Sequence, residues 1–320
     1  MRVFVAGATG VIGRFLVPGL IAAGHEVTAS TRSPAKVGNL EAQGATPVVV
    51  DGLDRKAVVQ AVTAAKPEVI VHEMTALTSL RGFRNFDKEF AVTNELRGKG
   101  TDYLLEAAEQ AGARRFIAQS FAGWNYARQG GMVKTEEDPI DPHPPASAAK
   151  SMAALLHLED SVRARAPEGL VLRYGPLYGH GASDMMLDAL RKRQLPLIGG
   201  GAGVWSFTEV TDAAAATVAA VNQGTPGIYN VVDDDPAPVS QWLPYLASSM
   251  GVKPPMRAPI WLGRLLGGEM VIVLMTAGRG ASNDKAKREF GWTPAYPSWR
   301  DGFPAWVETY KAGQKAGHAA

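Results

Sequence analysis

Short runs of Val, Ile and Ala alternate with longer amphipathic stretches through the first half of the chain. The runs predict strands at residues 2–6, 25–30, 46–50, 68–72 and 115–118. The stretches between them predict helices at residues 11–23, 35–43, 55–65 and 89–111. Strands separated by helices of this length form right-handed βαβ units around a parallel sheet that is buried on both faces. The pattern therefore predicts an α/β fold with a doubly wound parallel sheet.

The second half begins with a Pro-, Gly- and acid-rich loop at residues 130–145 and continues with a mixed pattern. A helix is expected at 148–165 and a sixth strand at 169–173. Further segments follow, with helices expected at 185–193, 213–221, 240–250 and 283–290 and strands at 195–198, 204–210 and 228–231. We expect a Rossmann-type domain at 1–179, to which 204–233 returns. Residues 180–320 are expected to form mainly a smaller C-terminal substrate lobe.

Composition excludes several kinds of function. The 320 residues include no cysteine and carry a formal net charge of only +2. Disulfides, thiolate catalysis and Cys-ligated metals are thereby excluded, and the six histidines show no metal-ligand spacing, so we expect no metal. The small net charge gives no reason to expect nucleic acid as a partner. No apolar run approaches the ~20 residues of a membrane span, and no signal peptide is evident, so we expect no membrane partner and a cytoplasmic location.

A glycine-rich turn joins the first predicted strand to the first predicted helix. Its sequence from residue 6 is Ala-Gly-Ala-Thr-Gly-Val-Ile-Gly. Gly7 permits the tight turn, Gly10 lets the backbone approach a pyrophosphate, and Gly13 lets the helix pack closely on the sheet. The free N–H groups at a helix start attract phosphates. The turn therefore predicts a dinucleotide site, with contacts from the residues of this turn: Gly7, Thr9, Gly10, Val11, Ile12 and Gly13.

The end of the second strand indicates which dinucleotide is preferred. Enzymes for NAD place an acid there for the ribose 2′-hydroxyl. This chain has Thr31 and Arg32 instead, with Lys36 soon after. Arg32 can form a fork on a 2′-phosphate, so NADP(H) is predicted, with NAD(H) remaining possible. Asp51 after the third strand is a candidate for the adenine amino group, and Gly52 and Leu53 adjoin it.

Several motifs together resemble the extended short-chain dehydrogenase/reductases, the NAD(P)-dependent epimerase/dehydratase family. They are the turn at 7–13, Thr93-Asn94 with Gly100-Thr101 and Leu104-Leu105, Leu172-Arg173 with Tyr178-Gly179, the stretch 207–212, Ile228-Tyr229-Asn230-Val231, and the stretch 285–292. The resemblance covers nearly the whole chain. It implies a Rossmann-type sheet and hydride transfer between a nicotinamide and a substrate carbon.

The same resemblance assigns catalytic positions and exposes one departure. Family members carry a Ser or Thr after the fifth strand and a Tyr-x-x-x-Lys on the next helix. Ser120 takes the first place and would orient the substrate oxygen. Lys150 takes the Lys place and would hold the nicotinamide ribose. The Tyr place is Ala146, which cannot move a proton, although such help is typically worth ~10²–10⁴-fold.

Other groups could replace the missing tyrosine. Tyr126 is ranked first among them, and the alternatives are Tyr174, Tyr178, His143, Lys134 and the pair His72-Glu73. Nucleotide-sugar enzymes of the family place an Arg where this chain has Trp205, and Trp offers a single N–H to a diphosphate. An apolar substrate pocket is therefore favoured, with Trp124, Tyr174, Tyr178 and Trp205 as its candidate residues.

Three hypotheses on function remain open. The first is an NADP(H)-dependent oxidoreductase, or hydride-shuttle epimerase, acting on a small organic carbonyl or alcohol. The second is a catalytically silent NADP(H)- or ligand-sensing protein, favoured by Ala146 and opposed by the retention of Ser120 and Lys150. The third is a redox-neutral isomerase or lyase with bound cofactor. The family resemblance also implies a homodimer, paired through the helices predicted at 89–111 and 148–165.

Overall fold

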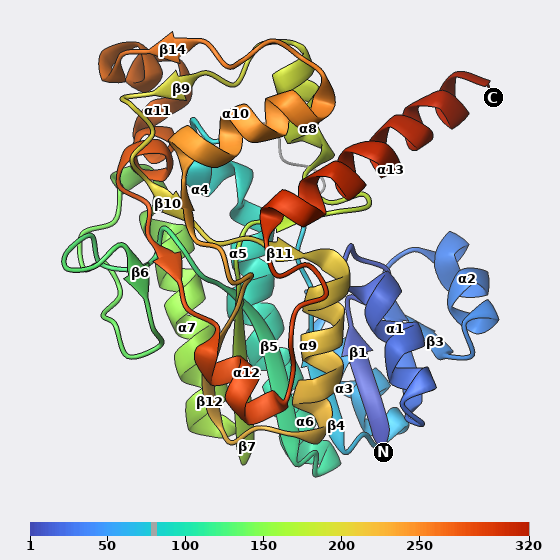
Figure 1. Cartoon of the computed structure of the whole chain (residues 1–320). Coiled ribbons are helices and arrows are strands. Elements are labelled where there is room, and N and C mark those ends of the chain that lie inside the picture. The colour runs from blue at the N-terminus through green and yellow to red at the C-terminus, as the bar shows by residue number, and fades with distance from the viewer. Residues whose placement is uncertain (78–81, 320) are drawn as a thin grey trace.

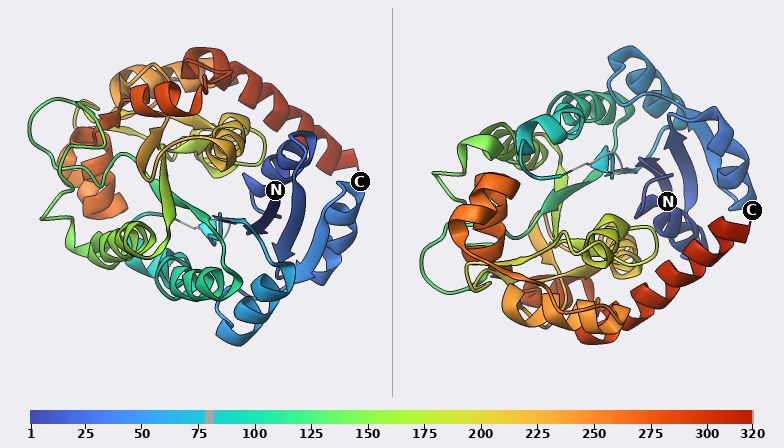
Figure 2. Two further views of the ribbon diagram at one scale, coloured as in Figure 1. Left: turned by 90° about the horizontal axis from the view of Figure 1, so that it is seen from below. Right: turned by 90° about the horizontal axis from the view of Figure 1, so that it is seen from above.

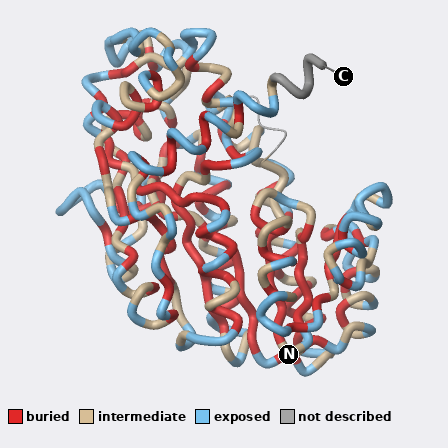
Figure 3. Tube along the Cα trace, turned by 45° about the vertical axis from the view of Figure 1, so that its right-hand side comes forward, coloured by how far each residue is buried: buried red, intermediate tan, exposed pale blue. Residues whose placement is uncertain are grey.

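The apolar runs form the seven strands of one parallel sheet (Figure 1). The computed structural model describes residues 1–77 and 82–319. The strand order across the sheet is β12 (Gly227–Val231), β7 (Glu168–Tyr174), β5 (Arg115–Phe121), β4 (Val69–His72), β1 (Arg2–Ala6), β2 (Glu26–Thr31) and β3 (Thr46–Val49). All six pairings are parallel. The predicted doubly wound α/β fold is confirmed, and Figure 3 shows buried residues along most of the sheet.

Helices cover both faces of the sheet, as the views along the strands show (Figure 2). One face carries α1 (Gly13–Ala22), α9 (Val210–Asn222) and α12 (Asp284–Phe290), which bury Leu16, Ala216 and Phe290 against it. The other face carries α3 (Arg55–Ala65), α6 (Thr101–Ala111) and α7 (Ala149–Arg165). The short helix α2 (Val37–Ala42) lies beside β3. The sheet therefore has two apolar cores, one on each face.

A second group of elements lies above the carboxyl ends of the strands in Figure 1. Its helices are α8 (Asp184–Arg191), α10 (Val239–Met250), α11 (Ile260–Thr276) and α13 (Trp299–Ala319). Its short strands are β8 (Leu177–Tyr178), β9 (Leu197–Ile198), β10 (Val204–Trp205), β11 (Thr208–Glu209), β13 (Ala237–Pro238) and β14 (Arg257–Ala258). An aromatic core holds this lobe together, formed by Tyr178, Phe207, Trp242, Phe303 and Trp306.

The remaining elements connect the two parts. They are the 3₁₀ turns η1 (Pro34–Lys36) and η4 (Ala146–Ala148), the helices α4 (Phe86–Glu89) and α5 (Ala91–Glu95), the π-helical turn η3 (Leu96–Gly100), and the paired short strands β6 (Val133–Lys134) and β15 (Gly280–Ala281). Among the described residues, no helix is long and apolar enough to cross a membrane.

Two predicted elements are divided in the structure, and two long helices were not predicted. The single helix predicted at 89–111 is α5, η3 and α6 in succession, because a π-helical turn interrupts the regular pattern. The strand predicted at 204–210 divides into β10 and β11, and α9 begins at Val210 because the Glu209 side chain caps it. Helices α11 and α13 were not predicted at all.

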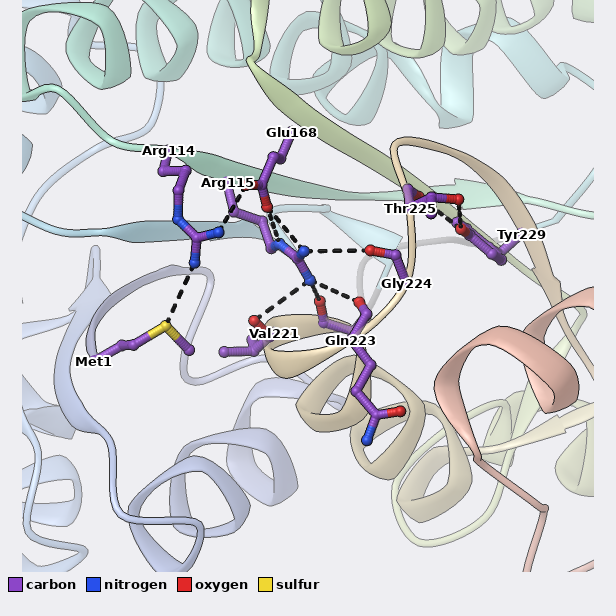
Figure 4. A network of polar contacts seen from close by, with 10 residues as sticks. Met1, Arg114, Arg115, Glu168, Val221, Gln223, Gly224, Thr225 and Tyr229 are labelled. Carbon is purple, nitrogen blue, oxygen red and sulfur yellow. Dashed lines mark hydrogen bonds and ion pairs between the residues drawn. The ribbon is translucent and has the colours of Figure 1, made fainter.

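Arg115 ties the far end of the sheet to the far end of α9 (Figure 4). Its guanidinium donates to the carbonyls of Ala220, Gln223 and Gly224 at 2.7, 2.6 and 3.2 Å. Its Nε also donates to Glu168 Oε2 at 2.8 Å. The orphan carbonyls of a helix C-terminus are thus satisfied by a buried cation, as the helix dipole favours.

Candidate functional site

The glycine-rich turn lies between β1 and α1, at the carboxyl edge of the sheet. Gly7 has φ +93°, a left-handed conformation that suits glycine. A Cβ on Gly13 would stand 2.5 Å from the Gly7 and Ala8 carbonyl oxygens. The backbone N–H groups of Val11 and Ile12 donate to no acceptor in the described part of the chain. The turn therefore forms a close-packed cradle whose free donors fit a pyrophosphate.

The loop after β2 is placed beside this cradle. Thr31 Oγ1 lies 3.2 Å from Thr9 Oγ1 and accepts from Ser33 N at 3.1 Å, which fixes the loop to the turn. Arg32 and Lys36 are exposed, and neither pairs with an acid of the described residues. Their side chains are therefore available to a phosphate group on an adenosine ribose.

The loop after β3 supplies the next wall of the crevice. Asp51 Oδ1 accepts from Leu53 N at 3.0 Å. A Cβ on Gly52 would meet the Met74 sulfur at 2.4 Å, so any larger residue would have to displace the Met74 side chain. Asp51 remains exposed and can still accept a hydrogen bond from an adenine amino group.

Two of the predicted catalytic residues belong to one buried polar network. Ser120 Oγ donates to Glu159 Oε1 at 2.6 Å, and Glu159 accepts from Arg173 Nε at 2.8 Å. Arg173 Nη1 donates to the Tyr126 hydroxyl at 3.1 Å, and that hydroxyl donates to Asn230 Oδ1 at 2.5 Å. Burial raises the pKa of Tyr126 to about 12, against the opposing effect of Arg173. Ser120 and Tyr126 are thus held inside the protein by their partners.

Lys150 lies outside this network. Its side chain is exposed and forms no hydrogen bond or ion pair with the described residues. Its backbone N–H donates to Asp87 Oδ2 at 2.9 Å, and Ser151 donates to Asp87 Oδ1 through both N and Oγ. Asp87 thus satisfies the start of α7, while Ala146 stands one turn earlier in η4. The predicted Ser120, Lys150 and Tyr126 do not form one catalytic group.

The pair His72-Glu73 ends β4 next to the glycine-rich turn. Glu73 Oε1 lies 3.1 Å from the Tyr174 hydroxyl, which lies 2.6 Å from Thr217 Oγ1, and Glu73 Oε2 is buried with no partner in the described chain. Burial raises the pKa of Glu73 to about 8, although the Tyr174 hydrogen bond opposes the shift. Burial lowers the pKa of His72 to about 4. Near neutral pH both side chains are therefore mainly uncharged.

The other proposed substitutes lie in different surroundings. The Lys134 ammonium is buried and donates to Gln129 O and Asp138 Oδ1 at 2.7 and 3.0 Å. His143 is exposed on its loop. Tyr178 is fully buried in the core of the C-terminal lobe, in edge contact with Phe207 and Phe303. In this structure Tyr178 therefore lies in an apolar core, and the Tyr174 hydroxyl faces Glu73 and Thr217.

Trp124 and Trp205 do share a cavity. It has a volume of about 10 Å³ and lies where β5, the turn before β8 and the end of α11 meet. Its wall is mainly apolar and is formed by Phe121, Ala122, Gly123, Trp124, Pro176, Val204, Trp205, Ser206, Leu274, Gly278 and Arg279. Trp205 Nε1 donates to Leu274 O at 2.8 Å, and Arg279 Nε is buried without a partner among the described residues. The wall therefore combines aromatic rings with the guanidinium of Arg279, whose Nη1 donates to Ala277 O at 2.9 Å.

The buried Glu73 carboxyl predicts an unusual pH dependence of stability. Its folded pKa is raised, so between the usual carboxyl pKa and about 8 the folded state holds a proton that the unfolded state has lost. The free energy of unfolding must then fall with rising pH across this window, by up to about 1.4 kcal/mol per pH unit from this group. We expect Glu73→Gln to leave the Tm unchanged at pH 5 and to raise it at pH 8, as thermal melts at both pH values would show. A Tm gain of equal size at both pH values would contradict the assignment.

Sequence reasoning did not single out four residues that lie in or beside the site. Glu159 and Arg97 lie on helices, where charged side chains ordinarily face solvent, and no pattern distinguished them. Arg279 follows an apolar helix that was itself not predicted. Met74, which packs on Gly52, had no signal either. On the described residues, no group of three or more His, Cys, Asp or Glu side chains is placed to hold a metal.

The features described above are those of a dinucleotide-binding α/β enzyme. They are a parallel sheet with a glycine-rich turn after its first strand, backbone N–H groups free to bind phosphates, and a buried polar network beside the crevice. The chain belongs to the NAD dependent epimerase/dehydratase family, whose model matches residues 3–231. It is thus an NAD(P)-dependent oxidoreductase or epimerase, as the relatives also support.

Two curated relatives are named reductases. A 3-diazoavenalumate denitrifying reductase from a Streptomyces species is 48% identical over 309 residues, which cover 94% of this chain and 99% of the relative. A 4-hydroxy-2-methyl-3-oxo-4-farnesyl-3,4-dihydroquinoline-1-oxide ketoreductase from Stigmatella aurantiaca is 27% identical, covering 99% of this chain and 98% of the relative. The chain therefore spans nearly the full length of both.

Solved structures share the fold. The UDP-glucose 4-epimerase of Thermotoga maritima, solved with UDP-glucose, has a TM-score of 0.76 at 23% identity, covering 98% of this chain and all of its own. A human epimerase family protein solved with NADPH has a TM-score of 0.74 at 20% identity, covering 96% of this chain and 99% of its own.

Proposed function

We propose that this protein is an NADP(H)-dependent reductase whose hydride transfer needs no proton from a tyrosine. The observation that carries the proposal is the catalytic gap. Ala146 occupies the tyrosine place, Lys150 is exposed, and the Tyr126 hydroxyl is bonded to Asn230 and Arg173. A carbonyl substrate requires a proton on its oxygen as hydride arrives. A substrate that releases a neutral leaving group does not.

The substrate class that meets this condition is an aromatic diazonium compound. The 48% identical relative acts, by its name, on a diazo compound and removes its nitrogen. A bound reduced nicotinamide would supply hydride to the carbon that carries the nitrogen, the C–N electron pair would leave with N₂, and the nicotinamide would be oxidised by two electrons. This reaction consumes no proton, so its rate does not depend on an acid at position 146. The ketoreductase relative is more distant in sequence. In this chain the Tyr126 hydroxyl is bonded to Asn230 and Arg173, so Tyr126 would not donate a proton to a ketone substrate.

The chain's own residues then bind and orient. The turn from Gly7 to Gly13 would hold the pyrophosphate through its free N–H groups, and its fit is supported by the absence of space for any Cβ at Gly13. Trp124 and Trp205 would contact the arene only if their shared cavity widens, because its volume of about 10 Å³ holds no more than about one water molecule. Arg279 would pair with an acidic group on the substrate.

The test is isotopic. The purified protein is incubated with NADPH carrying deuterium at the transferable position and a carboxylated benzenediazonium salt as the probe. We expect one deuterium in the arene, at the carbon that lost nitrogen, with one N₂ and one NADP⁺ formed per arene. Incubation without protein, and with a Trp124→Ala variant, controls for spontaneous reduction. NADPH binding without turnover of any diazonium probe would contradict the proposal and favour the sensor hypothesis.

The preference for NADP(H) over NAD(H) follows from Arg32 and is a second prediction. Arg32→Ala is expected to weaken NADPH binding by about tenfold and to leave NADH binding within about twofold, because a charge-assisted fork on the 2′-phosphate is lost. Calorimetric titration of both nucleotides measures this. Lys66→Ala is the matched control, because Lys66 is a surface cation at the end of α3, away from the loop. Equal weakening of both nucleotides would overturn the assignment.

The domain division, the homodimer and the cytoplasmic location stay predictions. We propose residues 1–179 as the cofactor domain, to which β12 returns, and 180–320 as mainly the substrate lobe. Pairing through α6 and α7 would give a homodimer, and sedimentation of a monomer at all concentrations would exclude it.

A further inference from the structure

Arg97 is a buried cation that has no hydrogen-bond partner among the described residues. It lies in the π-helical turn η3 and is only 5% exposed. It forms no hydrogen bond or ion pair with any residue that the structure describes, and its Nε is closed off from solvent. Such a group costs several kcal/mol in a folded protein unless something compensates its charge.

The nearest carboxylate cannot provide that compensation fully. Glu159 attracts Arg97, but its oxygens are already occupied by Ser120 at 2.6 Å and by two nitrogens of Arg173 at 2.8 and 2.5 Å. Burial lowers the pKa of Arg97 to about 10 despite Glu159. Arg97 also opposes protonation of His72 at the end of β4. The charge of Arg97 therefore acts on His72, and the described residues do not fully neutralise it.

The position of Arg97 relates it to one half of the dinucleotide crevice. The glycine-rich turn after β1 marks the pyrophosphate, and the Arg32 loop after β2 marks the adenosine side. The other half of a dinucleotide must extend over β4 and β5. The turn η3 that carries Arg97 packs against α7, and Arg97 interacts electrostatically with His72 at the end of β4 and with Glu159, which accepts from Ser120 of β5. Its neighbour Leu96 packs beside Gly52 on the wall of the same crevice.

The local backbone explains how a helical arginine turns inward. A π-helical turn adds one residue to the helical repeat and rotates the side chains around it, and such turns are frequent at functional sites. The turn η3 packs against α7. Arg97 therefore faces the gap between η3, α7 and the sheet, while the flanking Lys99 is exposed and pairs with Glu95.

We propose that Arg97, rather than Lys150, is the cation that binds the nicotinamide half of the cofactor, donating to its ribose hydroxyls. The inference rests on the proposed dinucleotide function. Five N–H donors in a rigid plane suit adjacent hydroxyls. An unneutralised cation here also disfavours the positively charged oxidised nicotinamide, so the protein should bind NADPH more tightly than NADP⁺.

The test compares three ligands, NADPH, NADP⁺ and adenosine 2′,5′-bisphosphate, on three variants. NADP(H) spans both halves of the crevice, whereas adenosine 2′,5′-bisphosphate reaches only the adenosine side. Arg97→Met is expected to weaken NADPH by about tenfold, to leave the bisphosphate within about twofold, and to reduce the preference for NADPH over NADP⁺. Arg97→Lys should recover part of the loss. Lys150→Met should bind all three ligands like the wild type.

A thermal melt of the ligand-free protein separates binding from structure. Removing an uncompensated buried charge should leave the Tm of Arg97→Met equal to or above that of the wild type. A lower Tm, a failure to fold, or equal weakening of NADPH and the bisphosphate would assign Arg97 a structural role and overturn the inference. Unchanged NADPH binding would also overturn it. A wild type that binds neither ligand would instead refute the proposed function itself.

Discussion

Replacing Glu159 with alanine is expected to destabilise the protein by about 3–5 kcal/mol, because it strands a buried positive charge. The Glu159 and Arg173 side chains are only 4% and 3% exposed, and both guanidinium bonds to the carboxylate are 2.8 Å or shorter. Without the carboxylate, Arg173 keeps only the Tyr126 hydroxyl, and Ser120 loses its acceptor. Urea denaturation of the ligand-free protein measures the loss.

The matched control is an exposed ion pair on the neighbouring helices. Glu109 of α6 accepts from Arg165 of α7 at 3.0 Å, with half of the Glu109 side chain in solvent. Glu109→Ala is expected to cost no more than about 1 kcal/mol. If Glu159→Ala costs as little as this control, the charge of Arg173 must be compensated by another group and the network described above is wrong.

Adding a single methyl group at Gly13 is expected to abolish dinucleotide binding. The Cβ would stand 2.5 Å from two backbone oxygens, of Gly7 and Ala8, and backbone at this distance cannot yield without moving the turn. Because the turn and the start of α1 form the phosphate cradle, we expect NADPH affinity to fall by at least about a hundredfold, together with a stability loss of about 1–3 kcal/mol from overpacking.

Gly38→Ala provides the control for this change. Gly38 lies in helix α2, and a Cβ there would meet nothing within 4 Å. Alanine favours a helix over glycine by about 0.5–1 kcal/mol, so this variant should be slightly more stable and bind NADPH unchanged. A Gly13→Ala variant that binds NADPH as well as Gly38→Ala would place the pyrophosphate elsewhere.

The sheet was predictable because two local signals agreed. Strand composition and helix spacing defined β1 to β5, and the three glycines located the crevice. Helix α11 was not predictable in the same way, because it is apolar on nearly all sides and has a kink at Gly268, where φ is +80°. Without a polar face there was no helical period to detect.

The catalytic group was harder to predict for a different reason. The spacing from Ala146 to Lys150 is preserved, but spacing along a chain does not determine which side of a helix faces the crevice. Lys150 is exposed at the start of α7, while Ser151 beside it is buried. The partner choices of Ser120 and Tyr126 depend on Glu159 and Asn230, which are distant in sequence. Only the three-dimensional arrangement reveals that these hydroxyls are already bonded.

The Arg115 contacts of Figure 4 have a consequence for synthesis on the ribosome. Arg115 belongs to β5, but its carbonyl acceptors come 105 to 109 residues later in the chain. A nascent chain that has just completed β7 therefore carries an arginine that has Glu168 but lacks its carbonyl acceptors, and an open sheet edge, which invites pairing with other chains. Both remain until β12 emerges, so this stretch of translation is where the protein depends most on protection from aggregation.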